Sequence, residues 1–175
     1  MIGQSPAQAI ANLLQTLQRC LSCVTDAVLH PAPVQGRGSD NYLRIGLGAA
    51  GGRLRGDGPA VLIFREYVAT EQLEGERRRW RAHAVGYACS LAQDDGHEYL
   101  SYHWHDQGPS HVRTPHLHLG AGAGLGWPLL VKAHLPTGVV LLPAIIELAI
   151  DLGARPLRAD WRETLAVARA ALAEA

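Results

Sequence analysis

The sequence predicts an α+β domain, with an N-terminal helix and two C-terminal helices packed on an antiparallel sheet of about four to six strands. Apolar residues recur at helical spacing near both ends of the chain, whereas its middle part contains short β-rich runs separated by turn residues such as Gly, Asp and Gln. Strands and helices do not alternate as they would around a parallel sheet. No linker or internal repeat divides the chain, so we expect a single domain over residues 1–175.

The first helix is expected to begin at Ser5, whose hydroxyl can accept a hydrogen bond from a free amide of the first turn. Pro6 suits the first helical position, and Gln8 completes a Ser-x-x-Gln capping box. An apolar stripe follows at helical spacing, formed by Leu13, Leu14, Leu17, Leu21 and Val24. We expect this helix to give way to a strand over residues 25–29.

The middle of the chain contains the expected sheet. Its runs are rich in β-branched and aromatic residues, and Gly, Asp and Gln mark the turns between them. Gly86 interrupts one run and predicts a β-bulge. The expected strands are residues 42–47, 60–69, 79–91, 97–105 and 115–119.

Two helices are expected to complete the domain. Residues 139–152 are apolar on nearly every side, which indicates a helix that lies against the sheet and ends at Gly153. The last helix is expected to open with a second capping box, formed by Asp160 and Glu163. Trp161 then begins the buried stripe of this helix.

The composition gives no sign of a strongly charged partner. Sixteen basic residues offset sixteen acidic ones, so the net charge does not indicate binding to nucleic acid or to an anionic membrane. The longest apolar run, residues 139–150, is too short to span a bilayer and contains Pro143 and Glu147. Three cysteines form no disulfide pattern, and the first residues lack the basic start of a signal peptide. We therefore expect a soluble cytoplasmic protein that does not associate with membranes.

Two familiar motifs are given little weight. Residues 46–51 read G-x-G-x-x-G, but the glycine-rich continuation cannot open the helix that a dinucleotide site needs. Cys20 and Cys23 form a C-x-x-C on the first expected helix, and no second pair accompanies them. We therefore interpret Cys20 and Cys23 as thiols of the hydrophobic core rather than as a redox or metal site.

The most informative residues are two His-x-His pairs, His103/His105 and His116/His118. Alternate residues of a strand share one face, so each pair presents both imidazoles on the same side. If the two strands pair, four imidazoles meet on one surface. Imidazole carries protons near neutral pH, and it is also the commonest ligand for zinc and similar transition metals. Asp106 is the only carboxylate between the two pairs.

Three segments resemble the toxins of TumE-type bacterial toxin–antitoxin pairs. They are residues 56–67 (GDGPAVLIFREY), residues 101–104 (SYHW) and residues 114–120 (TPHLHLG). Residues 107–113 depart from the family, which usually has an Arg-Tyr-Asp-Asn-like run before its proline–histidine segment. The resemblance implies a nuclease-like toxin, an RNA substrate and an antitoxin protein as partner. The positions carried over to this chain are Glu66, His103, His116 and His118, with Arg65 and Arg113 as nearby basic candidates.

Three functions are compatible with these observations. The first is a metal-independent endoribonuclease in which His103 and His116 transfer protons and an arginine, Arg113 or Arg65, stabilises charge on the phosphate. The second is an enzyme acting on a small molecule through a divalent transition metal such as zinc, with ligands from both His-x-His pairs, His103, His105, His116 and His118. The third is a non-catalytic binding or accessory protein. The resemblance favours the first, without a cofactor.

Overall fold

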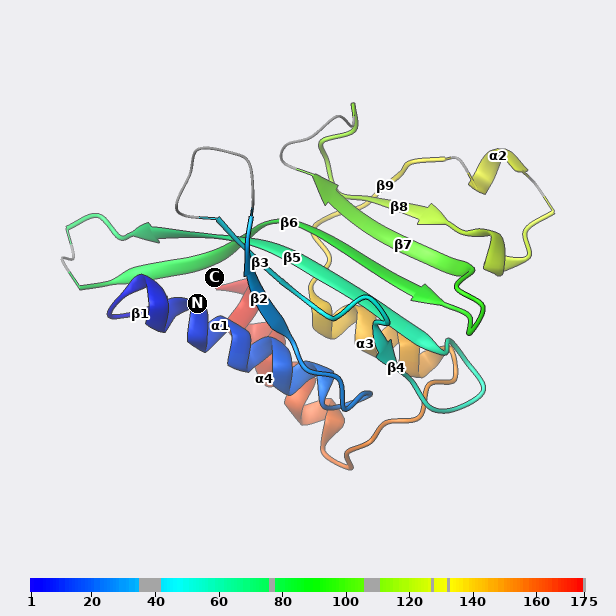
Figure 1. Cartoon of the computed structure of the whole chain (residues 1–175), viewed down its shortest axis with the longest axis horizontal. Helices are drawn as coiled ribbons and strands as arrows, with labels where there is room; N and C mark the ends of the chain where they lie inside the picture. The colour runs from blue at the N-terminus through cyan, green and yellow to red at the C-terminus, as the bar shows by residue number, and fades with distance from the viewer. Residues whose placement is uncertain (35–41, 76–77, 106–110, 127, 132, 175) are drawn as a thin grey trace.

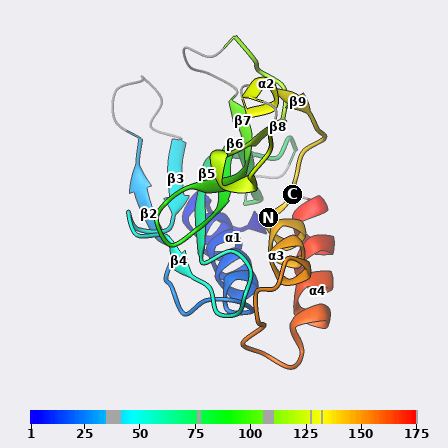
Figure 2. The same ribbon diagram turned by 90° about the vertical axis from the view of Figure 1, so that its right-hand side faces the viewer.

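The computed structural model describes residues 1–34, 42–75, 78–105, 111–126, 128–131 and 133–174. In this part of the chain nine strands form one antiparallel sheet. Three helices pack on one of its faces (Figures 1 and 2), and they are α1 (Pro6–Leu21), α3 (Leu142–Asp151) and α4 (Trp161–Ala173). This confirms the α+β class, although the sheet has more strands than the four to six expected.

The additional strands are short edge pieces of two to four residues. The main path through the sheet is β2-β3-β5-β6-β7-β8-β9, with β1 paired to β6 and β4 paired to β5. The strands are β1 (Ile2–Gly3), β2 (His30–Pro33), β3 (Tyr42–Gly46), β4 (Gly52–Arg53), β5 (Val61–Gln72), β6 (Trp80–Ala92), β7 (Glu98–His105), β8 (His116–Leu119) and β9 (Leu135–Pro136). A 3₁₀ turn, η1 (Ala121–Ala123), and the one-turn helix α2 (Pro128–Val131) lie between β8 and β9.

Helix α1 begins as the sequence predicts. The Ser5 hydroxyl accepts a hydrogen bond from the backbone N–H of Gln8 at 3.2 Å, and Pro6 occupies the first turn. The Gln8 side chain accepts from the N–H of Gln4 at 2.9 Å, so the capping box closes one residue earlier than expected.

The strand expected over residues 25–29 is absent, and β2 starts at His30 instead. The reason is the side chain of Gln18, which donates to the carbonyl of Ala27 at 3.0 Å and accepts from the N–H of Leu29 at 2.8 Å. These bonds tie the segment to α1. β2 contains two prolines, which an edge strand tolerates because one side of its backbone needs no ladder partner.

The long hairpin of β5 and β6 contains the predicted bulge. The register shifts between Tyr67 and Val68, so that Val85, next to Gly86, has no residue opposite it. A second shift, between Leu91 and Ala92, leaves Tyr99 of β7 unpaired. The alternation of β7 is therefore broken near its start, and the strand begins at Glu98 rather than at residue 97.

The core lies between the sheet and the three helices. Alternate residues of β5 and β6, such as Leu62, Phe64 and Leu91, pack there against apolar side chains of α1 and α3. Tyr102 of β7 packs against this core, and Trp104 is partly buried, with its ring edge-on to Tyr87 at 6.0 Å between centroids. The cysteines are free, buried thiols, as predicted for Cys20 and Cys23, and the third is Cys89.

Both C-terminal helices differ slightly from expectation. Helix α3 begins at Leu142 rather than residue 139, and the preceding N–H of Val140 donates to the hydroxyl of Tyr87 at 3.0 Å. At α4, Asp160 forms no capping hydrogen bond, because its carboxylate accepts two bonds from the guanidinium of Arg158 at 2.8 and 2.7 Å. This bidentate pair occupies both carboxylate oxygens of Asp160.

The glycine-rich segment after β3 opens no helix. Gly51 has a positive φ of 67°, and the two-residue strand β4 follows it. In the described part of the chain, no helix is long and apolar enough to cross a membrane.

Candidate metal centre

The two His-x-His pairs meet on the sheet face opposite the three helices. β7 and β8 are antiparallel neighbours, with His103 directly opposite His116 and Ser101 opposite His118. Directly opposed residues share one face. The residues between the histidines, Tyr102 and Leu117, are paired with each other and point to the other face. The structure therefore places all four imidazoles on one face of the sheet, as predicted.

A fifth histidine joins them from a distant part of the chain. His134 precedes β9, whose Leu135 pairs with Leu117, so His134 lies beside His118. Its ring centroid is 4.3 Å from that of His118 and 4.9 Å from that of His116. We call His103, His105, His116, His118 and His134 the histidine cluster. No sequence pattern indicates His134, because β9 has only two residues and its pairing with β8 is a tertiary contact.

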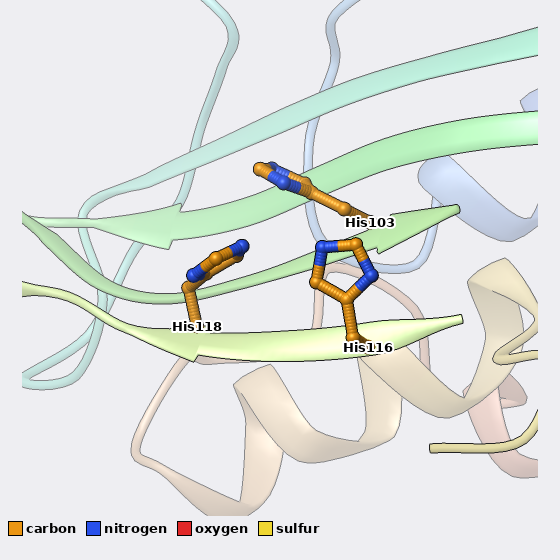
Figure 3. Close-up of side chains that lie close together, drawn as sticks. All are labelled: His103, His116 and His118. Atoms are coloured by element: carbon orange, nitrogen blue, oxygen red, sulfur yellow. The ribbon is translucent and has the colours of Figure 1, made fainter. Parts of the chain in front are cut away.

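Three members of the cluster are placed for joint ligation. One ring nitrogen from each of His103, His116 and His118 lies within 4.8 Å of the others, and Figure 3 shows the three rings converging. Nitrogens bound to one tetrahedral zinc ion at roughly 2.0–2.1 Å lie about 3.3 Å apart. Binding of one such ion would bring the three nitrogens closer together than the 4.8 Å within which they now lie. His105 is not a member of this group of three. Its ring centroid lies 5.2 Å from that of His103 and 6.0 Å from that of His116.

The environment favours the neutral form of His103, His105 and His118. His116 is only 2% exposed, and His103, His105 and His118 are partly buried. Burial, reinforced by the neighbouring histidines, lowers the pKa of His103 to about 4. Burial and nearby histidines also lower the pKa of His105 and of His118. An uncharged imidazole is the form that binds a metal.

Hydrogen bonds orient two of the rings. Nδ1 of His116 lies 2.8 Å from the carbonyl oxygen of Thr114. A carbonyl only accepts, so Nδ1 carries the proton and Nε2 is left as a free ligand atom. Nε2 of His103 lies 2.7 Å from the hydroxyl of Ser101, which lies 2.7 Å from the hydroxyl of Ser90. Metal-binding histidines commonly have such a partner on their second nitrogen.

The other residues proposed from the sequence are not members of the three-histidine group. Glu66 is on β5 and points to the helix-covered face, where it is buried and its Oε2 has no hydrogen-bond partner. Arg65 is exposed on the open face, in the row Arg65–Ala88–His103 across three strands. Arg113 is exposed in the segment before β8. Asp106 lies outside the described residues.

Histidines elsewhere provide a contrast. His97 is exposed, and its Nδ1 lies 3.3 Å from the carboxylate of Asp95. His83 is partly buried on β6, and its Nδ1 lies 4.0 Å from Glu71. Both have carboxylate neighbours, whereas the three-histidine group contains no acidic side chain.

Comparison with protein-family models, curated proteins and solved structures found no match. Three imidazoles that converge on one sheet face can hold a transition-metal ion and leave a coordination position for water or substrate.

Proposed function

We propose that this protein is a metal-dependent enzyme, with His103, His116 and His118 as ligands of one transition-metal ion and a small molecule as substrate. The observation that carries the proposal is the convergence of three ring nitrogens within 4.8 Å of one another, contributed by two adjacent strands. Bound there, the ion would act as a Lewis acid and activate water at neutral pH.

The number and setting of the ligands favour catalysis over a structural role. Structural zinc sites have four protein ligands, whereas catalytic sites usually have three and an open position. The hydrophobic core lies on the other face of the sheet, so the fold does not depend on an ion at the cluster. His105 and His118 are only partly buried, so solvent reaches the site.

The donor set also limits the choice of ion. Imidazole nitrogens suit zinc, copper and nickel, whereas magnesium and calcium prefer oxygen ligands. The three-histidine group offers nitrogen donors only. We therefore expect Zn²⁺, Ni²⁺ or Cu²⁺ to bind and Mg²⁺ not to compete.

Metal analysis tests the proposal directly. Protein purified without added metal, then dialysed against Zn²⁺, is expected to bind one ion per chain by elemental analysis. His116→Ala should abolish this binding, and His118→Ala should weaken it strongly. His97→Ala is the matched control and should bind like the wild type, because His97 is outside the cluster. Binding that is unchanged in His116→Ala would refute the site.

A second candidate, metal-free RNA cleavage, is favoured by one observation. His103 and His116 are directly opposed, with ring centroids 5.7 Å apart, and Arg65 shares their row about 10 Å from His103. Proton transfer needs one charged and one neutral imidazole. Burial and the crowding of histidines oppose the charged form of His103, which leaves it the proton-accepting role. The convergence of three ring nitrogens has no part in this mechanism, which is why we place this function second.

The two candidates differ in their response to a chelator. RNA cleavage that persists in EDTA and is lost in His103→Ala would support the nuclease, and the resemblance to TumE-type toxins would then also imply an antitoxin partner. Either function is proposed to operate in the cytoplasm, where three free, buried cysteines would remain reduced.

A further inference from the structure

A chain of side-chain hydrogen bonds leads from the histidine cluster into the sheet. The hydroxyls of Ser90 and Ser101 are 2.7 Å apart, and Ser101 Oγ is 2.7 Å from Nε2 of His103. Both serines are almost fully buried, with exposures of 4% and 1%. Ser101 lies directly opposite His118 and two residues before His103 on the same face. It therefore stands between two of the three ligands.

Which group donates in each of these two hydrogen bonds decides whether His103 can bind a metal. A neutral imidazole has one N–H and one free nitrogen. Because Nε2 is occupied by Ser101, only Nδ1 is available as a ligand, and it is free only when Nε2 carries the proton. The N–H of Nε2 must then donate to Ser101, and Ser101 must donate to Ser90. In the opposite direction, Nδ1 would carry the proton and ligation would be blocked.

The partner of His103 differs in kind from the partner of His116. The carbonyl of Thr114 fixes the tautomer of His116, since a carbonyl cannot donate. A hydroxyl can do either, so Ser101 fixes the tautomer of His103 only if its own proton has another acceptor. Ser90 supplies that acceptor in a place that water does not reach freely.

We propose that Ser101 is a positioning residue that holds His103 in the tautomer protonated on Nε2, with Ser90 as the acceptor that orients the Ser101 hydroxyl. The role in metal binding rests on the proposed function, whereas the tautomer is a property of the metal-free protein. Loss of such an outer partner typically lowers metal affinity roughly 10- to 100-fold.

The variants separate orientation from folding. Ser101→Ala removes the acceptor and leaves a buried N–H without a partner, so the His103 ring should change its tautomer or turn. Ser90→Ala keeps the Ser101 hydroxyl but removes its acceptor, and it should have the same effect in weaker form. Ser22→Ala, at the end of α1 beyond the helix-covered face, is the control and should change neither property.

Long-range ¹H–¹⁵N NMR of metal-free protein with ¹⁵N-labelled histidine reads the tautomer of each ring, and the signals missing in His103→Asn assign His103. We expect the proton on Nε2 of His103 and on Nδ1 of His116 in the wild type. Ser101→Ala should shift the His103 pattern and lower Zn²⁺ affinity roughly 10- to 100-fold in a chelator competition. A wild-type proton on Nδ1 of His103, or an unchanged tautomer and affinity in Ser101→Ala, overturns the proposal. A wild type with the expected tautomers that binds no Zn²⁺ refutes the proposed metal function while leaving the positioning role in place.

Discussion

Replacing Glu66 with glutamine should stabilise the protein at high pH and flatten part of its pH dependence. The carboxyl group is fully enclosed among core side chains, and burial raises its pKa from 4.5 to about 7, with the Met1 amino group opposing this effect only in part. Between those two values, the folded protein retains a proton that the unfolded chain releases. The free energy of unfolding therefore falls as pH rises through this window, and the loss is complete above about pH 7.

The size of the effect follows from the two pKa values. Each pKa unit corresponds to about 1.4 kcal/mol, so the interval from 4.5 to about 7 amounts to about 3 kcal/mol. Glu66→Gln removes the ionisation while keeping a side chain of similar shape. The stability difference between Glu66→Gln and wild type should thus grow by about 2–3 kcal/mol from about pH 5 to about pH 8.

Urea unfolding followed by tryptophan fluorescence measures this difference at each pH. The comparison cancels other titrating groups, including His103, whose lowered pKa contributes a slope of opposite sign. Glu163→Gln, on the exposed side of α4, is the control and should follow the wild type at every pH. A constant difference between Glu66→Gln and wild type would refute the buried, ionisable placement of Glu66. Loss of Zn²⁺ binding in Glu66→Gln would instead connect this residue to the cluster.

Three further predictions concern the cluster and the scaffold. Zn²⁺ affinity should fall as pH decreases towards about 4, because burial lowers the pKa of His103 to about 4 and also lowers that of His118, so protons compete for these nitrogens only in acid; competition titrations that show no pH dependence would argue against histidine ligands. His105→Ala should keep one Zn²⁺ per chain and change the free energy of unfolding by less than about 0.5 kcal/mol, because His105 is outside the three-histidine group. Phe64→Ala, in the core, should lower the free energy of unfolding by about 3–5 kcal/mol in urea. Ser5→Ala should cost about 1 kcal/mol through loss of the α1 cap, and unchanged stability would show that the observed contact with Gln8 contributes nothing.

Local patterns in the sequence were sufficient for the three long helices, for the longer strands and for four of the five clustered histidines. The cap at Ser5 and the alternation of His116, Leu117 and His118 depend only on residues close in sequence. They can therefore be predicted without knowing the tertiary contacts. The place of His134 depends on β9 returning to β8 from beyond α2, and no local signal records that pairing.

Glu66 shows that a motif can be present while its side chain lies on the other face of the sheet. Its place between Arg65 and Tyr67 resembles a family motif, but alternation along β5 turns it toward the helices. The face that a strand residue occupies depends on which side the helices cover. A motif alone does not contain this information.

The alternation of the strands also explains how an open surface can hold a precise site. Each of the three histidines has a chain neighbour on the opposite face of the sheet, with Tyr102 beside His103 and Leu117 beside both His116 and His118. Packing of Tyr102 against the core fixes the backbone on which Ser101 and His103 are mounted. Rigid elements with locked neighbours hold functional groups more accurately than loops do. The two faces of the same strands can therefore have separate roles, since one packs the core and the other carries the histidines that we propose as ligands.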